Sequence, residues 1–334
     1  MAKQKIVIAT RESPLAMWQA RHVAQEIESR CPGFSTELLG MTTTGDQQLA
    51  TSLSKIGGKG LFVKELETAL MDGRADLAVH SGKDVPMQLP LGMELAVIDS
   101  REDPRDALIL PSATSRTQGV PLIDSLEALV SMLPDGAVIG TSSLRRKAQL
   151  QALCQGRRFV IRDLRGNLNT RLKKLDDGEY DAIILAAAGM KRLGWEHRIS
   201  AYFTVGSMLP AVAQGALAVE YQQSRREYLH PVLDALVQHE TRLCVAAERA
   251  FNYTLQGSCQ VPIAAHAELA QDHLSMRGLV AAVDGSELLE ENSAVALGAT
   301  DPDQQIQLAE SIGQNLADKL LARGARRILD QALG

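Results

Sequence analysis

The sequence predicts an α/β protein with an α+β region at its C-terminal end. Short apolar runs alternate with amphipathic stretches over the first two hundred residues, a pattern typical of mainly parallel sheets that bind ligands at the carboxyl ends of their strands. From about residue 234 the pattern changes to helical stretches, three strand-like runs and a long helix over 301–322. The 334 residues, 45% of them hydrophobic, suffice for two or three domains.

The first hundred residues alternate strand and helix. We expect strands over 6–9, 34–39 and 75–79, and helices over 14–27 and 61–71. Ser13 and Pro14 suit the N-cap and the first position of the first helix. The third strand should deliver the residues 80–84 to a loop.

A second alternating unit follows the charged, proline-broken segment 99–106, which we interpret as a hinge. Its expected strands are 137–140, 159–161 and 181–186, and its expected helices are 144–154 and 168–175. An apolar, glycine-rich stretch over 206–220 indicates a return crossing. We therefore expect three domains, formed by 1–99 with 216–233, by 104–214 and by 234–334.

One stretch, 141–174, holds ten basic residues and one acidic residue, Asp163, in a chain of formal net charge −5. The basic residues are Arg145, Arg146, Lys147, Arg157, Arg158, Arg162, Arg165, Arg171, Lys173 and Lys174. Arginine binds carboxylates and phosphates through paired hydrogen bonds. Both basic motifs follow strand ends, where helix N-termini add affinity for anions. The stretch therefore favours a small molecule that carries several acid groups.

Two other interpretations of this stretch stay open. Nucleic acid fits less well, because no aromatic residues are interleaved and the chain is only 4% aromatic. A solvated helix face with surface salt bridges is the plainer reading. A separate glycine-rich loop over 41–60 carries Lys55 and Lys59, without the spacing of a phosphate loop. That loop favours a mobile cationic lid over nucleotide hydrolysis.

Three groups suit chemistry. Cys259 follows two small residues, in a loop that can expose a thiol as a nucleophile or attachment point. Asp84, directly after Lys83, could hold a developing cation or pass protons to a substrate nitrogen, or form half of a surface Lys–Asp pair. His80 could be a ligand or a base, although a structural role is commoner for a single histidine.

The other three cysteines, Cys31, Cys154 and Cys244, are expected to be inert core residues. No CxxC spacing occurs, which argues against a zinc site and a disulfide framework and favours the reducing cytoplasm. No apolar run is long enough to cross a bilayer, and the first residues lead into a strand pattern instead of a secretion signal. We expect a cytoplasmic protein that binds no metal, nucleic acid or membrane.

Six motifs occur in order over about 260 residues, and together they resemble one family closely, the porphobilinogen deaminases, also called hydroxymethylbilane synthases. The motifs are Ile8-Ala9-Thr10-Arg11-Glu12-Ser13-Pro14-Leu15-Ala16, Gly57-Gly58-Lys59-Gly60-Leu61-Phe62-Val63-Lys64-Glu65-Leu66-Glu67, Arg101-Glu102-Asp103-Pro104-Arg105-Asp106-Ala107, Gly140-Thr141-Ser142-Ser143-Leu144-Arg145-Arg146, Leu164-Arg165-Gly166-Asn167 and Gly257-Ser258-Cys259-Gln260-Val261-Pro262-Ile263.

The resemblance implies an α/β fold of two lobes similar to those of periplasmic binding proteins, with mixed, mainly parallel sheets, and a C-terminal α+β domain that carries the cysteine. It implies a monomeric transferase of tetrapyrrole and heme biosynthesis. Such an enzyme joins four porphobilinogen molecules head to tail on a covalent dipyrromethane cofactor. It releases ammonia at each addition and then frees hydroxymethylbilane by hydrolysis.

The resemblance also assigns roles to residues of this chain. Cys259 matches the cofactor attachment point, and Asp84 with Lys83 matches the catalytic pair. The matching cofactor-binding residues are Ser13, Lys83, Thr141, Ser142, Ser143, Arg145, Arg146, Arg165 and Gly166. Arg11, Arg165 and Arg171, with Lys55 and Lys59 of the lid, are the expected substrate-binding residues. A chain of acid-bearing pyrroles would explain the arginine-rich stretch.

Two positions depart from the family pattern. Gly82 stands where such proteins usually have methionine or leucine, and Ala213 stands where they usually have glycine. The rival hypothesis is a non-enzymatic anion-binding protein, such as a solute receptor or regulator. It leaves the cysteine region without a role, and a colour test with acidic Ehrlich's reagent would separate the two because only the enzyme carries a dipyrrole.

Overall fold

The computed structural model describes residues 3–43, 63–112, 120–154, 159–258, 260–298 and 301–333. The chain forms two compact units, Met1–Glu102 with Ala216–Arg242, and Asp103–Gly215 with Leu243–Gly334. It therefore crosses between the units after residues 102, 215 and 242. The further division of the second unit into two domains stays a prediction.

The first unit is built on a five-stranded mixed sheet of order β2-β1-β3-β11-β4. β1 pairs in parallel with both β2 and β3, whereas β11 runs antiparallel to β3 and β4. The strands are β1 (Gln4–Arg11), β2 (Phe34–Met41), β3 (Leu77–Ser81), β4 (Met93–Ile98) and β11 (Leu217–Gln222). The helices are α1 (Pro14–Arg30), α3 (Lys64–Met71) and α8 (Arg226–Leu236), and Gly82–Asp84 forms a short 3-10 helix.

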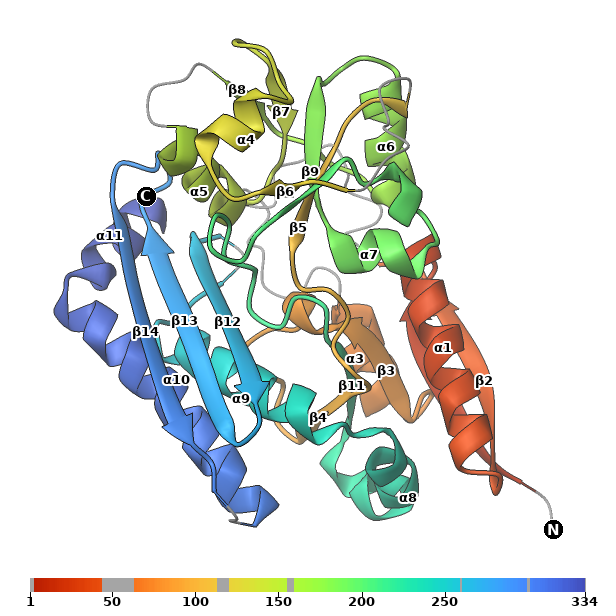
Figure 1. Cartoon of the computed structure of the whole chain (residues 1–334). Coiled ribbons are helices and arrows are strands. Elements are labelled where there is room, and N and C mark those ends of the chain that lie inside the picture. The colour runs from red at the N-terminus through yellow and green to blue at the C-terminus, as the bar shows by residue number, and fades with distance from the viewer. Residues whose placement is uncertain are drawn as a thin grey trace. The chain divides into compact units, whose positions relative to one another are not determined.

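Alternation along the strands divides the apolar side chains of this sheet between its two faces. Ile6 and Ile8 of β1 join the core formed with α1 and α8, while Ala9 joins the core formed with α3. Figure 1 shows α1 running alongside β2. Ser13 is the N-cap of α1 and Pro14 its first residue, as predicted. Both faces are therefore covered, which leaves the strand ends to present polar residues.

Several of the element boundaries that the sequence predicts in this unit were wrong. His80 and Ser81 belong to β3, and only Gly82–Asp84 leaves the strand, as a 3-10 helix in place of the expected loop. The helix expected from residue 61 begins at Lys64 within the described residues. The first helical stretch expected from about residue 234 is α8, which begins earlier, at Arg226.

The second unit contains a six-stranded mixed sheet of order β6-β10-β5-β9-β7-β8. β7 pairs in parallel with β8 and β9, whereas β5 is antiparallel to β9 and β10. The strands are β5 (Asp106–Ile109), β6 (Leu122–Ile123), β7 (Val138–Gly140), β8 (Val160–Arg162), β9 (Ala182–Ala186) and β10 (Ala201–Phe203). The helices are α4 (Leu126–Val130), α5 (Leu144–Cys154), α6 (Leu168–Asp176) and α7 (Ala187–Arg192), with a 3-10 turn at Glu196–Arg198.

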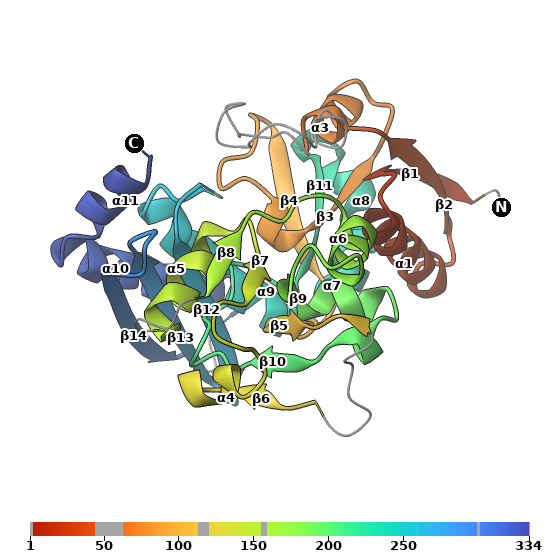
Figure 2. The same ribbon diagram turned by 90° about the horizontal axis from the view of Figure 1, so that it is seen from above.

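Helices cover both faces of this sheet as well (Figures 1 and 2). Leu108 and Ile184 pack against α4 and α5, while their neighbours Ile109 and Ile183 pack against α6 and α7. The hydrophobic residues of β9 therefore point alternately to two cores, which explains its continuous apolar run.

The C-terminal part of the same unit is an antiparallel sheet, β12-β13-β14, with helices beside it. The elements are α9 (His239–Thr254), β12 (Ile263–Ala270), β13 (His273–Ala281), β14 (Leu288–Ala296), α10 (Pro302–Ala322) and α11 (Ala325–Leu333). Gly313 lets α10 approach α9 closely, because a Cβ there would lie 2.0 Å from the Ala247 carbonyl oxygen. The three strands confirm the α+β prediction, and the two mixed sheets confirm the α/β class.

The C-terminal sheet packs directly against α5. Ala148 of α5 joins a core with Leu209, Ala264 and Leu279. Gly285, in the turn between β13 and β14, has a φ of +71°, and a Cβ there would lie 2.6 Å from the backbone nitrogen of Ala152. The arginine-bearing helix therefore rests on the C-terminal sheet within one compact unit.

Candidate active site

The two basic motifs lie at one edge of the six-stranded sheet, as the sequence predicts. β7 and β8 are parallel neighbours, so their carboxyl ends meet at the same edge. The residues 141–143 follow β7 and lead into α5, and the residues 163–167 follow β8 and lead into α6. The backbone N–H of Thr141 donates to the Arg162 carbonyl at 2.9 Å, which joins the starts of the two loops.

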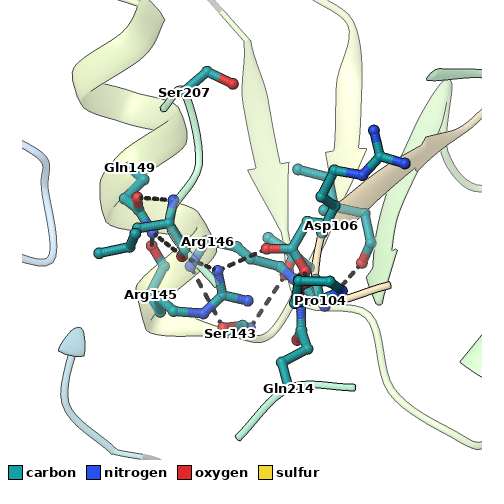
Figure 3. Close-up of polar contacts among 12 residues, drawn as sticks. Pro104, Asp106, Ser143, Arg145, Arg146, Gln149, Ser207 and Gln214 are labelled. Carbon is teal, nitrogen blue, oxygen red and sulfur yellow. Dashed lines mark hydrogen bonds and ion pairs between the residues drawn. The ribbon is translucent and has the colours of Figure 1, made fainter. Parts of the chain in front are cut away.

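A buried pair of arginines forms the centre of this edge (Figure 3). Arg145 Nη1 lies 2.6 Å from Asp106 Oδ2, and Arg146 Nη2 lies 2.7 Å from Asp106 Oδ1. Arg146 Nε donates to the same Oδ1 at 3.0 Å. The two arginines also donate to the Leu209 and Ile184 carbonyl oxygens, at 2.7 and 2.9 Å. One carboxylate thus binds two guanidinium groups.

The charges in this centre do not cancel. Two guanidinium groups and one carboxylate leave one net positive charge, with Asp106 fully buried and the arginines 5% and 6% exposed. Burial raises the pKa of Asp106, but the charges and hydrogen bonds of Arg145 and Arg146 outweigh it and hold that pKa well below its usual range. Burial lowers the pKa of Arg145, against the opposing charge of Asp106. A buried excess of positive charge favours an anionic ligand.

The plainer reading, a solvated helix face, is therefore wrong for Arg145 and Arg146. Solvent exposure is instead found for other basic residues of the stretch 141–174. Arg162 is exposed, and exposed Lys173 forms a surface ion pair with Asp177 at 2.6 Å. No local pattern indicated that Asp106 would be the partner of the two arginines, because Asp106 lies in the segment that we interpreted as a hinge. Asp106 is instead the buried first residue of β5.

Hydroxyl groups fix the loop before α5. Thr141 is buried, and its Oγ1 accepts from the Ser143 backbone N–H at 3.2 Å. Ser142 is exposed, and its hydroxyl donates to the Leu164 carbonyl of the neighbouring loop at 2.9 Å. Ser143 Oγ accepts from the Arg146 N–H at 3.4 Å, in the manner of a helix N-cap. These residues are therefore held where the helix N-terminus can attract an anion.

The second loop orients two further arginines. Gly166 has a φ of +111°, and a Cβ there would lie 2.7 Å from Thr170 Cγ2, so this turn requires glycine. Arg171 Nε donates to the Gly166 carbonyl at 2.8 Å. Arg165 lies 3.5 Å from Asp163 through Nη2 and is 28% exposed. Both arginines are thus partly open and attached to the same turn.

In the first unit, four predicted residues lie at the ends of two adjacent parallel strands. Arg11 ends β1, Ser13 caps α1 directly after it, and Lys83 and Asp84 follow β3. Gln19 of α1 donates to Ser81 Oγ at 2.8 Å, which ties the helix to the end of β3. The Asp84 side chain is exposed and Lys83 is half-buried. A carboxylate at this edge can meet a substrate directly.

His80 has a structural partner. Its Nε2 lies 3.1 Å from Glu220 Oε2, and both side chains are buried. Burial and then the charge of Glu220 raise the pKa of nearby Glu67, against the opposing effect of His80. Gly82 next to this pair is buried, and its N–H donates to the Ala216 carbonyl at 2.9 Å. His80 therefore supports the strand that leads to Asp84.

Three predicted residues, Lys55, Lys59 and Cys259, lie outside the described residues. Ser258, directly before Cys259, is exposed, and Gly257 is partly buried. The three remaining cysteines, Cys31, Cys154 and Cys244, are buried, as predicted. Burial raises the pKa of Cys154 to about 11, so that thiol is a poor nucleophile. Among the described residues, no cluster of histidine, cysteine, aspartate or glutamate is suited to hold a metal ion.

Two family models match the chain. One, described as porphobilinogen deaminase, dipyromethane cofactor binding domain, matches residues 6–230. The other, described as porphobilinogen deaminase, C-terminal domain, matches residues 242–322. The first match includes the predicted site residues from Arg11 to Arg171, and the second includes Gly257 and Ser258.

Curated relatives agree with these matches. The porphobilinogen deaminase of Chromobacterium violaceum is 52% identical over 98% of each chain. That of Thiobacillus denitrificans is 50% identical over 97% of this chain and 98% of its own. A solved extracellular-binding protein from Bacillus subtilis is 14% identical to this chain, and the match covers 70% of this chain and 90% of its own with a TM-score of 0.41. Two family models thus match most of the chain, and relatives are about 50% identical to it over nearly its full length. These matches show that the chain belongs to the porphobilinogen deaminase family.

Proposed function

We propose that this chain condenses four porphobilinogen molecules head to tail on a dipyrromethane bound through Cys259, and then releases hydroxymethylbilane by hydrolysis. The single observation that carries the proposal, beside family membership, is the buried centre with one net positive charge formed by Arg145, Arg146 and Asp106. Porphobilinogen carries an acetate and a propionate, so a growing pyrrole chain presents a series of carboxylates. Guanidinium groups bind such carboxylates in pairs.

The residues present suit a dipyrromethane cofactor. Hydroxyl and guanidinium donors gather on the loops around Thr141 and Arg165, which matches a ligand whose polar groups are carboxylates. Gly257 lies against Asn252, where a Cβ would lie 1.8 Å from Oδ1, so a larger residue two positions before Cys259 would have to displace the Asn252 side chain. When bound, the cofactor supplies the pyrrole carbon to which the first substrate unit is joined.

The chain's residues would divide the reaction between binding and charge stabilisation. Arg11, Arg165 and Arg171 hold substrate carboxylates, and Ser13 and Lys83 support them at the ends of the strands. Asp84 stabilises the cation that forms when the C–N bond of the aminomethyl group breaks and ammonia leaves. A new C–C bond then joins that methylene carbon to the unsubstituted carbon of the last pyrrole in the growing oligomer. That pyrrole carbon loses its proton. Asp84 is a suitable acceptor or relay for that proton.

The proposal extends to the protein's surroundings. We propose a monomer that acts in the cytoplasm, where thiols stay reduced, and that binds neither nucleic acid nor membranes. Within the described ranges, no helix combines the length and apolar character needed to span a membrane. Size-exclusion chromatography with light scattering checks the oligomeric state.

The direct test is to incubate the purified protein with porphobilinogen and to measure ammonia and the linear tetrapyrrole. We expect four ammonia molecules for each hydroxymethylbilane, and a pink product when the protein alone is treated with acidic Ehrlich's reagent. A protein that binds porphobilinogen, gives no colour and releases no ammonia would be an anion-binding protein, and the enzymatic proposal would fail.

A further inference from the structure

Side chains of the second unit hold the segment Leu209–Gly215 along its length. The Leu209 backbone binds Gln149 twice, with its N–H donating to Oε1 at 2.7 Å and its carbonyl accepting from Nε2 at 3.0 Å. The Ala213 N–H donates to Glu248 Oε2 at 2.6 Å, and the Gly215 carbonyl accepts from Arg192 Nη2 at 2.7 Å. This segment therefore has a fixed path up to the point where the chain leaves the unit.

Gln214 stands out in this segment because its side chain points to the arginine centre (Figure 3). It is 1% exposed, and its Nε2 donates to the Pro104 carbonyl at 2.6 Å and to Asp106 Oδ1 at 3.0 Å. Pro104 is the second residue after the chain enters this unit, and Gln214 is the second-last before it leaves. One carboxamide therefore joins both crossing segments to Asp106.

The hydrogen bonds of Asp106 show what Gln214 contributes. Oδ1 accepts from Arg146 Nε, Arg146 Nη2 and Gln214 Nε2, while Oδ2 accepts from Arg145. Gln214 is the neutral member of this set, so it orients the carboxylate without changing the net charge. If the carboxylate turned, both guanidinium groups would lose their geometry, because each is bonded to a different oxygen.

We propose that Gln214 is a positioning residue for substrate binding, which fixes Asp106 and, through it, the orientation of Arg145 and Arg146. The proposal rests on the proposed function, in which these arginines bind pyrrole carboxylates. Gln214 does not touch the substrate in this account. It acts through a second residue, and so its loss should weaken binding more than the chemical step.

Two substitutions separate geometry from charge. Gln214→Leu removes both hydrogen bonds and puts an apolar side chain of similar size in place of the carboxamide. Gln214→Glu adds a carboxylate beside Asp106 and cancels the net positive charge that an anionic substrate would otherwise neutralise. The matched control is Gln222→Leu, the same change at a carboxamide of the first unit, which removes the hydrogen bond from Gln222 Nε2 to the Leu70 carbonyl without touching Asp106.

The first measurement is independent of catalysis. The Nε–H of Arg146 is buried and bonded to Asp106, so its exchange with water, followed by NMR on arginine-labelled protein, reports the geometry of the pair. The second is steady-state kinetics with porphobilinogen. We expect Gln214→Leu to speed Arg146 Nε–H exchange and to raise KM about tenfold with little change in kcat, the size expected for one hydrogen bond to a charged group. Gln214→Glu should raise KM further, and Gln222→Leu should change neither the Arg146 Nε–H exchange nor KM.

Each outcome of these two measurements supports or overturns a stated part of the proposal. Unchanged Arg146 Nε–H exchange in Gln214→Leu would overturn the proposal. Faster exchange with an unchanged KM would show that the arginine pair does not hold substrate, which would overturn the functional part. A wild-type protein without any ammonia release would sink the proposed function, while the exchange measurement would still decide whether Gln214 positions Arg146.

Discussion

Arg145 Nη1 lies 2.6 Å from Asp106 Oδ2, and both side chains are buried. Removing one partner of a buried ion pair leaves an uncompensated charge, which is strongly destabilising. Asp106→Asn should therefore lower the free energy of unfolding at pH 7 by about 3–5 kcal/mol. The control Asp177→Asn breaks a solvent-exposed pair with Lys173 and should change the free energy of unfolding far less. Urea unfolding measures both.

The same variant has a defined pH dependence. The pKa of Asp106 is lowered in the folded protein, so its stabilising effect is present above the unfolded-state pKa and is lost as the pH falls towards the folded-state pKa. The stability difference between wild type and Asp106→Asn should thus be largest at neutral pH and should shrink below about pH 4. A difference that stays constant from pH 7 to pH 3 would contradict the assigned charge of Asp106.

Local patterns made much of this fold predictable. Ser13 and Pro14 identified the start of α1, because an N-cap and a proline act on adjacent backbone groups. Alternating apolar segments identified β7, β8 and β9 and placed the basic loops at strand ends. These features depend on neighbours along the chain, which a single sequence displays.

Partners distant in sequence were not predictable. Asp106 and Gln214 are 108 residues apart, and His80 and Glu220 are 140 apart, so no local pattern joins either pair. A charged segment with prolines resembles a solvated hinge until the sheet buries its last residue. The exposed position of Asp84 likewise depends on how β3 ends, in a 3-10 turn that its short sequence did not reveal.

Ala213 adopts a backbone conformation that suits glycine. Its φ is +57°, which costs an L-residue about 1–2 kcal/mol. In Ala213→Gly, the release of this strain should offset the stability lost with the methyl group and with the added conformational freedom of the unfolded chain. The free energy of unfolding should therefore be about 1 kcal/mol higher after Ala213→Gly than after Ala211→Gly, each relative to the wild type. Ala211 is the control because it does not have a positive φ. Thermal melting compares them, and an equal loss of stability in both variants would contradict the strain.

Asp84 is the proposed catalytic carboxylate. Asp84→Asn keeps the size of the side chain and removes its charge, so turnover should fall about a hundredfold or more, as for the loss of one preorganised electrostatic group. Because Asp84 is exposed, the melting temperature should change little. Asp72→Asn, at an exposed carboxylate of the same unit, is the control and should keep full turnover. Near-normal turnover of Asp84→Asn would reject the assignment.

The arginines should act at different stages of chain growth. Arg11→Leu and Arg165→Leu each remove a proposed partner of a substrate carboxylate, and the loss should cost about 2–5 kcal/mol where the pair is desolvated. Mass spectrometry of the covalent intermediates should show each variant stalling at its own chain length. Arg162→Leu changes an exposed arginine of the same basic stretch and should leave the intermediates unchanged. The same intermediates in all three variants would count against direct contact.

The most direct measurement of the central claim is the intact mass of the purified protein and of Cys259→Ser. We expect the wild-type protein to exceed its sequence mass by one dipyrromethane, because we propose that the Cys259 thiol carries the primer. Cys259→Ser should have the sequence mass and little activity, whereas Cys31→Ser, at a buried thiol, should keep the added mass. A wild-type protein of unmodified mass that is fully active would contradict the account.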